Sequence, residues 1–469
     1  MSAHSAAVPD SLLARLRDLM GASAVIAEPD RLVVYESDAL TYLRGTPLAA
    51  LLPGSRDEIR EAVRLLHDAN IPFVPRGSGT GISGGAVADG AVLLSTARLS
   101  RILGIDAQNR RAIVEPGVVT ALISEAAAVY GLRYLPDPAS AAACSIGGNV
   151  AQNAGGPHCL KHGVTSDHVL ALEVVRPDGS LVELGRGEDG GLDLGSLFIG
   201  SEGTLGIVTQ ITVRLVPLVP SVGTALALFP LMETAGWAVS EILASGVNPV
   251  AIEMLDQGTI RIVEESPFAA GLPTDVGAAL IVEVEGDPEE VAFAVRRAAE
   301  VARGSGASEV RVAADEEERA RLWQARKKAY GVLGRRAPEV LVQDAVVPRT
   351  RIAPVLERID EIAREHDLEN VNYFHAGDGN LHPHLLFDPR DPDQLARVAR
   401  ASEEIMRVCV EAGGTITGEH GVGLDKRRAM RLVFTEDELD AMRDLKAVLD
   451  PGDVCNPGKM LPPDEAEIR

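Results

Sequence analysis

The chain has 469 residues, of which 46% are hydrophobic and 3% aromatic, and its formal net charge is -23. This length exceeds what one hydrophobic core organises, so two or three domains are expected. The acidic balance argues against nucleic acid or an anionic membrane as a general partner, so an anionic substrate needs a local cluster of cations.

The cysteines and the N-terminus indicate the compartment. None of the four cysteines forms a CxxC pair, which predicts free thiols in a reducing environment. They are Cys144, Cys159, Cys409 and Cys455. The first twenty residues lack the basic and apolar regions of a secretory signal. We therefore expect a cytoplasmic protein, which would meet a membrane only through a partner.

The predicted elements change character along the chain. A helix is expected over about 10–20, and a strand, a helix and a strand follow, with Ser55 and Glu58 as the capping box of that helix. From about 91 to 216, short β-rich runs alternate with glycine-rich loops and one helix near 119–130. Three prolines between 215 and 232 argue against a membrane-spanning helix there. From 224 to 414, amphipathic helices alternate with strands, so we predict segments 1–40, 41–218, 222–414 and 415–469.

The first glycine-rich loop, Gly79 to Gly84, matches G-x-G-x-x-G letter for letter. In a dinucleotide-binding Rossmann fold this motif opens a helix. Here the next strand is expected at about Ala91, which leaves no room for a crossover helix and excludes that fold. Two interpretations remain: an anion-binding nest of backbone N–H groups beside Arg76, suited to a pyrophosphate, or a structural turn.

Two further loops share this composition. The run from Pro136 to Gly156 is almost uncharged, and its glycines would let a large planar ligand approach the backbone. Ser145, Asn149 and Asn153 would satisfy the polar edges of such a ligand. A third loop lies at 200–208. Three glycine-dense loops in one β-rich segment indicate an extended cofactor.

The stretch YFHAGDGNLHPHLLFD, residues 373–388, carries three histidines. Asp378-Gly379 predicts a two-residue hairpin turn, which would place His375 directly opposite His382. Opposed residues have Cβ atoms about 4.5–5.5 Å apart, close enough for two imidazoles to share a cation. The alternatives are a metal site, which needs a third ligand, and a hairpin that merely carries imidazoles.

The third ligand is sought in TGEHGVG, where Glu419 and His420 stand between glycines. A solvated loop is one interpretation. The other is that Glu419 completes a two-histidine, one-carboxylate site with open positions, which suits catalytic zinc, with iron or manganese as alternatives. The metal would lower the pKa of a substrate hydroxyl, and His420 is placed to take the proton as general base.

These motifs together resemble one family. VPRGSGTGISGGA, PDPASAAACSIGGNVAQNAGGPHCLKHGVTSDHVLALEVVRPDG, GSEGTLGIVT, HAGDGNLHPH and TGEHGVG are similar, in order and spacing, to the FAD-linked 2-hydroxy acid dehydrogenases. That family includes the FAD subunit of glycolate oxidase, D-lactate dehydrogenases and D-2-hydroxyglutarate dehydrogenase. The resemblance runs from about residue 40 to the end. It implies an α+β protein with a vanillyl-alcohol-oxidase (PCMH) type FAD-binding domain of two α/β subdomains, and an α/β cap domain with an antiparallel sheet.

The resemblance also implies particular residues. Segment 41–218 would bind FAD non-covalently, 222–414 would form the cap with the histidine motif, and 415–469 would return to the flavin. Metal ligands would be His375, His382 and Glu419. The residues that would hold FAD are Arg76, Gly77, Ser78, Gly79, Thr80, Gly81, Pro138, Ser140, Ser145, Gly147, Gly148, Asn149, Gly155, Gly156, Glu202, Gly206, Ile207 and Asn456.

A few positions are expected to bind the substrate or to limit its size. Arg326, in LWQARKKAYGVL, matches the substrate arginine of the family, although a solvated helix face is the alternative. The 2-hydroxyglutarate enzymes place a threonine where this chain has Tyr330 and a lysine where it has Val342. His384 replaces an asparagine. A second substrate carboxylate has thus lost its partners.

We therefore expect an enzyme that oxidises a small 2-hydroxy acid of the glycolate or D-lactate class, by hydride transfer to flavin N5. The alternatives are a D-2-hydroxyglutarate dehydrogenase, a non-catalytic flavin-binding subunit of a larger oxidase, and a zinc hydrolase without flavin. The electron acceptor is left open between a quinone, a cytochrome, a flavoprotein and an iron–sulfur subunit. The oligomeric state is also open, with a homodimer as one alternative.

Overall fold

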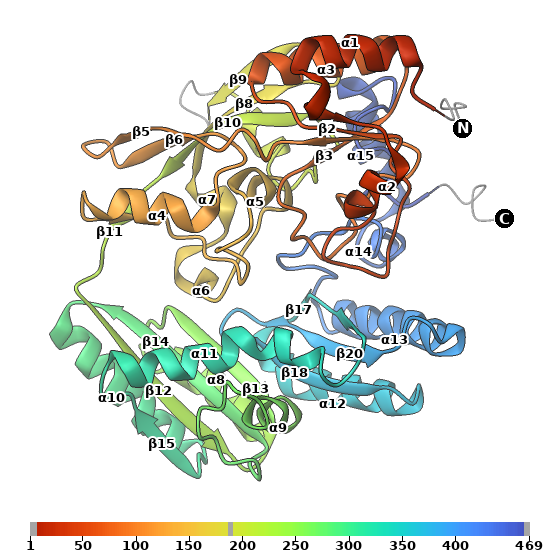
Figure 1. The fold of residues 1–469 in the computed structure, drawn as a ribbon. Coiled ribbons are helices and arrows are strands. Elements are labelled where there is room, and N and C mark those ends of the chain that lie inside the picture. The colour runs from red at the N-terminus through yellow and green to blue at the C-terminus, as the bar shows by residue number, and fades with distance from the viewer. Residues whose placement is uncertain (1–6, 186–190, 464–469) are drawn as a thin grey trace. The chain divides into compact units, whose positions relative to one another are not determined.

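The computed structural model describes residues 7–185 and 191–463, which form two compact units (Figure 1). The first unit comprises Met1–Gly155, Val164–Leu218 and Glu419–Arg469, and the second comprises Gly156–Gly163 and Val219–Gly418. The short segment 156–163 therefore belongs to the second unit, although its neighbours in the chain on both sides belong to the first.

The first unit begins with a four-stranded sheet. Its strands follow the order β1 (Val25–Ile26), β2 (Ala49–Leu51), β4 (Val92–Ser95) and β3 (Phe73–Arg76). Strand β3 pairs with β4 in parallel, and no helix forms among the described residues between them, so the exclusion of a Rossmann crossover is confirmed. The sheet packs against α1 (Asp10–Met20) and α3 (Arg56–Asp68) through an apolar core that includes Leu16, Ile59 and Phe73.

The sequence of α3 explains why it forms a helix and which face it buries. Ile59, Ala62, Val63 and Leu66 are fully buried and recur at the spacing of one helical face. Ser55 caps the N-terminus by accepting from the Glu58 N–H at 3.2 Å, as predicted. The return bond differs from a capping box, because the Glu58 carboxylate accepts from the N–H of Gly54, not of Ser55.

The first unit also contains an antiparallel sheet of five strands. Its order is β5 (Ile102–Asp106), β6 (Arg111–Val114), β10 (Ile207–Arg214), β8 (Val169–Val175) and β9 (Leu181–Gly185). A two-stranded sheet pairs β7 (Leu132–Arg133) with β11 (Val216–Pro217). The remaining helices of this unit are α2 (Pro29–Leu32), α4 (Thr120–Ala128), α5 (Ile146–Gln152), α7 (Thr165–His168), α14 (Met430–Val433) and α15 (Glu436–Leu449).

The second unit is built on a nine-stranded sheet. Its main path is β15 (Glu309–Val312), β12 (Ser221–Phe229), β14 (Ala278–Gly286), β13 (Ala251–Asp256), β18 (Glu369–His375), β19 (Asn380–Leu381) and β17 (Ala345–Val346). Off this path, β20 (Pro383–Phe387) pairs with both β18 and β16 (Glu339–Val342). The pairs are antiparallel, as predicted for the cap.

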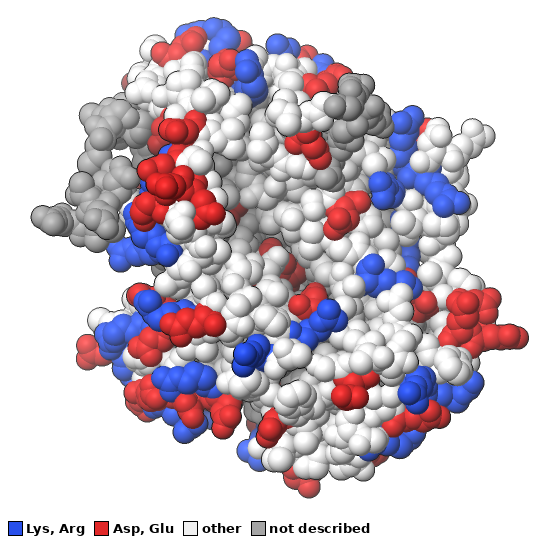
Figure 2. Space-filling model, turned by 180° about the vertical axis from the view of Figure 1, so that it is seen from behind, with Lys and Arg blue, Asp and Glu red and all other residues white. Residues whose placement is uncertain are grey.

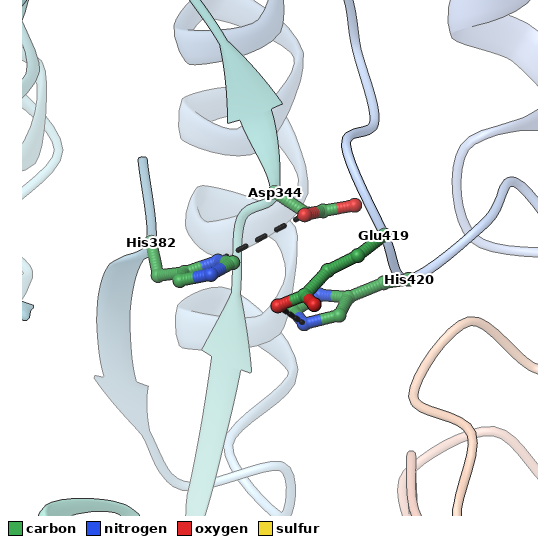
Figure 3. A group of neighbouring side chains, drawn as sticks. All are labelled: Asp344, His382, Glu419 and His420. Carbon is green, nitrogen blue, oxygen red and sulfur yellow. Dashed lines mark ion pairs between the residues drawn. The ribbon is translucent and has the colours of Figure 1, made fainter. Parts of the chain in front are cut away.

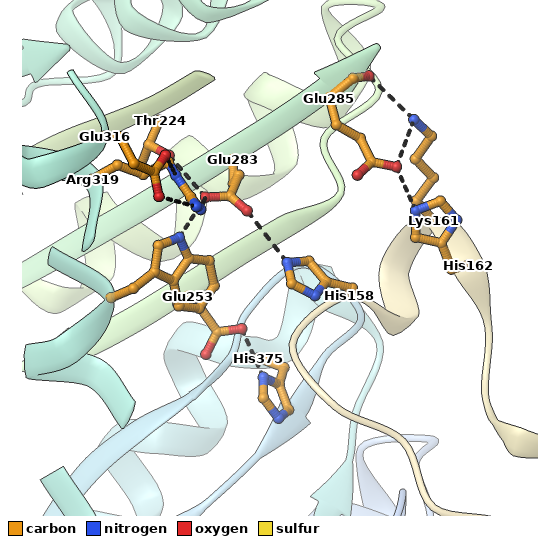
Figure 4. Close-up of polar contacts among 11 residues, drawn as sticks. His158, Lys161, His162, Thr224, Glu253, Glu283, Glu285, Glu316, Arg319 and His375 are labelled. Atoms are coloured by element: carbon orange, nitrogen blue, oxygen red, sulfur yellow. Dashed lines mark hydrogen bonds and ion pairs between the residues drawn. The ribbon is translucent and has the colours of Figure 1, made fainter. Parts of the chain in front are cut away.

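Long helices accompany this sheet. They are α8 (Met232–Ala244), α9 (Gln257–Glu264), α10 (Pro288–Gly304), α11 (Glu316–Leu333), α12 (Ile352–Glu365) and α13 (Pro392–Glu411), and the short α6 (Cys159–His162) comes from the inserted segment. Segment 156–163 is tied to β14 by polar contacts: His158 lies 3.3 Å from Glu283, and His162 lies 2.7 Å from Glu285 (Figure 4).

The surface mixes both signs of charge. Acidic and basic side chains are interspersed on the face shown in Figure 2. Ion pairs among exposed side chains include Arg64–Glu61 and Arg358–Glu365. All four cysteines are free thiols, as predicted. None of the helices among the described residues is both long and apolar enough to cross a membrane.

Candidate active site

Two of the predicted cofactor loops meet in the first unit. A Cβ atom on Gly77 would collide with Ser145 Oγ, and Gly148 N also lies near it, so the 76–81 and 140–149 loops pack against each other. Gly79 has a φ of 70°, and a side chain there would strike the guanidinium of Arg76. That guanidinium donates to the carbonyl of Ser37 at 2.7 Å. The absence of side chains on these glycines is therefore what lets the loops close on each other.

The C-terminal motif joins the same region. Asn456 is fully buried, and its Nδ2 donates to the carbonyl of Gly85 at 3.0 Å and to that of Glu202 at 2.7 Å. The motifs GISGG, GSEGT and CNPGKM, which are far apart in the sequence, are thereby linked through one amide.

Glu202 holds the loop that carries His420. Its two carboxylate oxygens accept from the N–H groups of Val422 at 2.6 Å and Gly423 at 2.8 Å. Gly421, with a φ of 82°, leaves no room for a Cβ beside the Glu202 carboxylate. The structure therefore gives Glu202 a role that the sequence did not indicate, which is to fix the backbone that follows Glu419 and His420.

The other predicted FAD residues are engaged in several ways. The side-chain amides of Asn149 and Asn153 form hydrogen bonds within the protein. Asn149 Nδ2 donates to Thr120 Oγ1, and Asn153 Oδ1 accepts from the N–H of Ser166. Ile207 lies in the core of the first unit beside Val175. The remaining residues differ in burial. Ser78 is exposed, and those that are half-buried are Thr80, Gly81, Pro138, Ser140 and Gly147. Gly155 and Gly156 are buried, one on each side of the unit boundary, and Gly206 directly precedes β10.

Glu202 also makes the stability of the first unit depend on pH. Burial raises the pKa of this carboxyl from 4.5 to about 7, although the two backbone donors and nearby Lys426 and Lys459 favour the charged form. The folded state thus binds the proton more tightly than the unfolded state. The resulting stabilisation is present below about pH 4.5 and is lost as the pH rises to about 7.

We expect Glu202→Gln, which cannot titrate, to lack this loss. The melting temperature of the variant minus that of the wild type should increase by about 5 °C from pH 5 to pH 8. The full pKa shift of Glu202 corresponds to at most about 3 kcal/mol of unfolding free energy. Thermal unfolding of both FAD-saturated proteins across this range measures the difference. A difference that does not change with pH would contradict the prediction.

In the second unit, the hairpin of histidines has a different register from the predicted one. His375 pairs with Asn380, so the turn comprises the four residues 376–379 and not Asp378-Gly379 alone. The prediction that His375 lies directly opposite His382 is therefore wrong. The two residues are diagonal neighbours on one face, and their rings still meet edge to face with centroids 5.1 Å apart.

Each of these rings is oriented by its Nδ1 atom. His375 Nδ1 lies 2.7 Å from Glu253 Oε1 (Figure 4), and His382 Nδ1 lies 3.1 Å from the carbonyl of Gln343. Both histidines are buried, at 5% exposure. Histidines that bind a metal through Nε2 commonly have Nδ1 held by a carboxylate or a carbonyl in this way.

Arg326 is buried in the same unit, on α11. Its exposure is 6%, whereas the adjacent Lys327 and Lys328 are exposed, so the alternative of a solvated helix face is wrong for Arg326. Its Nε lies 2.6 Å from Glu253 Oε2, and its guanidinium carbon lies 4.8 Å from the ring centroid of Tyr373. A buried cation is thus present where the sequence predicted one.

Tyr373, which the Arg326 guanidinium contacts, belongs to a group of aromatic side chains. His384 is buried and stacks on Tyr373 with ring centroids 4.0 Å apart, and the half-exposed ring of Tyr330 lies 6.5 Å from it. Val342 faces His384 across the β16–β20 ladder. Burial, with smaller effects from His382 and Arg326, lowers the pKa of His384 well below 6.5, so this ring is uncharged at pH 7.

Each unit has an acidic residue close to a histidine of the predicted site. Asp344 Oδ2 accepts from Thr417 Oγ1 at 2.5 Å and from the N–H of Gly418 at 2.9 Å, and its Oδ1 lies 3.9 Å from His382 Nδ1. In the first unit, His420 Nε2 lies 3.7 Å from Glu419 Oε1. Figure 3 shows both pairs. The sequence patterns gave Asp344 no role, although a carboxylate between two apolar strands is a usable signal.

The comparison with known families agrees with the glycine motifs. Residues 47–185 match the model described as "FAD binding domain", and residues 220–460 match "FAD linked oxidases, C-terminal domain". The chain belongs to the FAD-linked oxidase family. It is an FAD-linked oxidoreductase, and the resemblance drawn from its motifs is confirmed.

Relatives within this family align over nearly the whole chain. The chain is 42% identical to the glycolate oxidase subunit GlcD of Escherichia coli K12, over 97% of this chain and 93% of that protein. It is 40% identical to GlcD of Bacillus subtilis, over 92% and 93% of the two chains. It is 33% identical to a D-lactate dehydrogenase of Archaeoglobus fulgidus, over 91% and 96%.

Two solved structures share the fold at low sequence identity. p-Cresol methylhydroxylase with bound substrate has a TM-score of 0.78 at 15% identity, over 97% of both chains. The 4-ethylphenol oxidase of Gulosibacter chungangensis has a TM-score of 0.76 at 19% identity, over 98% of both chains. The predicted vanillyl-alcohol-oxidase (PCMH) type fold is thereby confirmed.

Proposed function

We propose that this FAD-linked oxidoreductase oxidises a small monocarboxylic 2-hydroxy acid, of the glycolate or D-lactate class, to the 2-oxo acid. We further propose that His375, His382 and Glu419 hold one divalent metal, with zinc favoured over iron or manganese. The observation that carries the proposal is that Arg326 and His375 both contact the buried Glu253 carboxylate in the second unit, and that the ring of His382 meets that of His375.

The residues present fit both cofactors. In the first unit, glycine loops offer backbone without side-chain bulk, and the buried atoms Ser83 Oγ, Gln152 Oε1 and Asn456 Oδ1 have no hydrogen-bond partner among the described residues. A flavin dinucleotide would satisfy such atoms. For the metal, two imidazoles with anchored Nδ1 atoms are a suitable donor pair.

Chain connectivity supports Glu419 as the third ligand. Gly418 is held by Asp344 through its N–H, and Asp344 also pairs with His382. Adjacent Cα atoms are about 3.8 Å apart, so the backbone of Glu419 starts within that distance of Gly418. A glutamate side chain that starts there is long enough to reach a metal bound to His382.

Each residue would have a separate task. When bound, FAD supplies the acceptor for the C2 hydride, and a divalent metal lowers the pKa of the substrate hydroxyl. Arg326, whose Nε is held by Glu253, would present its Nη groups to the substrate carboxylate as paired donors. His420 would accept the hydroxyl proton, and the backbone of its loop is fixed by Glu202.

A dye-linked assay tests this function. Purified protein should show flavin absorbance and should reduce an artificial dye with glycolate or D-lactate. It should lose this activity after treatment with a chelator and regain it with added Zn²⁺. Flavin-containing protein that oxidises none of these acids would favour the non-catalytic flavin subunit, and protein without flavin would contradict the proposal altogether.

The substrate should be small because a second carboxylate has no evident partner. Val342 and Tyr330 lie next to the uncharged His384, whereas Lys327, Lys328 and Arg349 are exposed. Burying an unpaired carboxylate costs several kcal/mol. We therefore expect kcat/KM for glycolate, D-lactate or a longer apolar 2-hydroxy acid to exceed that for D-2-hydroxyglutarate by at least about tenfold.

Steady-state kinetics on these four acids, with one dye acceptor, measures this preference. A clear preference for 2-hydroxyglutarate would mean that another cation replaces the missing lysine, and the argument from Val342 would fail.

We also propose that the protein is cytoplasmic and passes its electrons to a partner. The names of two relatives call them subunits of glycolate oxidase, which supports delivery of electrons to a partner rather than to oxygen. A quinone, a cytochrome, a flavoprotein and an iron–sulfur subunit are the alternatives, and contact with the membrane would be made through that partner. Co-purification of the natively expressed protein identifies it.

A further inference from the structure

Glu253 is a carboxylate in the middle of a buried strand. It lies on β13, which is flanked by β14 and β18, and its backbone faces Ile281 on one side and His375 on the other. Its side chain is fully buried. Taking a carboxylate out of water costs several kcal/mol unless it is paired, so its partners must account for its presence.

Those partners are two residues of the proposed site. Oε1 lies 2.7 Å from His375 Nδ1, and Oε2 lies 2.6 Å from Arg326 Nε. An ionised carboxylate only accepts hydrogen bonds, so His375 must carry its proton on Nδ1. A neutral imidazole protonated on Nδ1 has its lone pair on Nε2, where a metal binds.

We infer that Glu253 is a positioning residue for this site. It fixes His375 in the tautomer that presents Nε2 to the metal, and it holds the guanidinium of Arg326 for the substrate carboxylate. The inference rests on the proposed function for the identity of the metal and the substrate, but the hydrogen bond to His375 and the ion pair with Arg326 that carry it lie within the second unit.

The main alternative is that Glu253 only ties α11 to the sheet. Glu283 on β14 does so: it accepts from Thr224 Oγ1 at 2.8 Å and Arg319 Nη1 at 3.2 Å, and it also contacts Trp323 Nε1 (Figure 4). Arg319, Trp323 and Arg326 recur at the spacing of one helical face. Glu283 is also buried, at 3% exposure, and contacts the same helix, but its histidine partner is His158, not His375. It is therefore a matched control.

The test compares Glu253→Gln with Glu283→Gln. A glutamine has one acceptor oxygen and no charge, so it cannot both accept from Nδ1 of His375 and form the ion pair with Arg326. We expect Glu253→Gln to raise the dissociation constant for Zn²⁺ by about 10- to 100-fold, measured by chelator competition. It should also raise KM for the 2-hydroxy acid by about tenfold, with FAD content unchanged. Glu283→Gln should stay within about twofold of wild type. Equal behaviour of the two variants in zinc affinity and KM would overturn the inference.

A second measurement needs no Glu253 variant, in case Glu253→Gln does not fold. Nitrogen-15 histidine spectra of the wild-type protein, with the His375 signals assigned from His375→Gln, report the tautomer directly. Protonation on Nδ1 is expected before and after Zn²⁺ is added, and protonation on Nε2 in the metal-free protein would overturn the inference. If wild type binds no divalent metal, the metal proposal fails, whereas the tautomer and the KM comparison still test Glu253.

Discussion

Replacing His382 with alanine should abolish both metal binding and turnover while leaving FAD bound. The ring of His382 is held by the carbonyl of Gln343 and meets that of His375. Removing one of two imidazole donors leaves too few ligands for a catalytic divalent metal. Elemental analysis should find close to one metal per wild-type chain and almost none in the variant, and the flavin absorbance per chain should be equal in both.

His366→Ala is the control for this variant. His366 lies in the same unit at the end of α12, where its Nε2 is 2.9 Å from Glu404. The His366→Ala variant should keep metal, flavin and activity. A loss seen only in His382→Ala is then specific to His382 and is not a general effect of removing a histidine. The metal hypothesis would be falsified if metal-free wild type retained full activity.

Replacing His420 with alanine should slow the reduction of FAD by 2-hydroxy acid about 10²- to 10⁴-fold, the usual effect of losing a positioned base. Metal and flavin should both be retained, because the proposed ligand is the neighbouring Glu419. Anaerobic stopped-flow measurement of the flavin absorbance isolates this step from reoxidation by the acceptor.

The outcome also separates two roles for His420. If the variant loses its metal, His420 is itself a ligand and the assignment as base is wrong. His67→Ala serves as the control in the first unit, since His67 lies in the last turn of α3, a helix that packs on the sheet core. It should reduce FAD at the rate of the wild type.

Sequence patterns predicted the features that depend on neighbouring residues. The glycine loops, the Ser55 cap and helix α1 are of this kind, because turn conformation, capping and amphipathic spacing are local. The missing crossover helix after β3 followed from a simple count of residues. The contact between Gly77 and Ser145 could be anticipated only through family resemblance, since it joins loops far apart in the chain.

The hairpin register and Glu253 show what local patterns omit. Asp378-Gly379 favours a two-residue turn, but the pairing of His375 with Glu253 on β13, 122 residues away, accompanies a longer turn. Tertiary pairing thus overrides turn preference. A signal for Glu253 was nonetheless present, because an acid between Ile252 and Met254 interrupts an otherwise apolar strand and must find a partner when buried.

The interleaving of the two units also sets an order of assembly during synthesis. The first unit needs Phe73 to pair with Cys455 and Asn456 to reach Gly85, so it cannot be completed until the C-terminus has been made. At ordinary translation rates, about 240 further residues after Leu218 take roughly 10 to 50 s. The second unit, whose main segment ends at Gly418, can form its sheet within that interval, when segment 156–163 is already available to dock on β14. Most of the glycine-rich first unit is thus synthesised before the second unit but is completed after it.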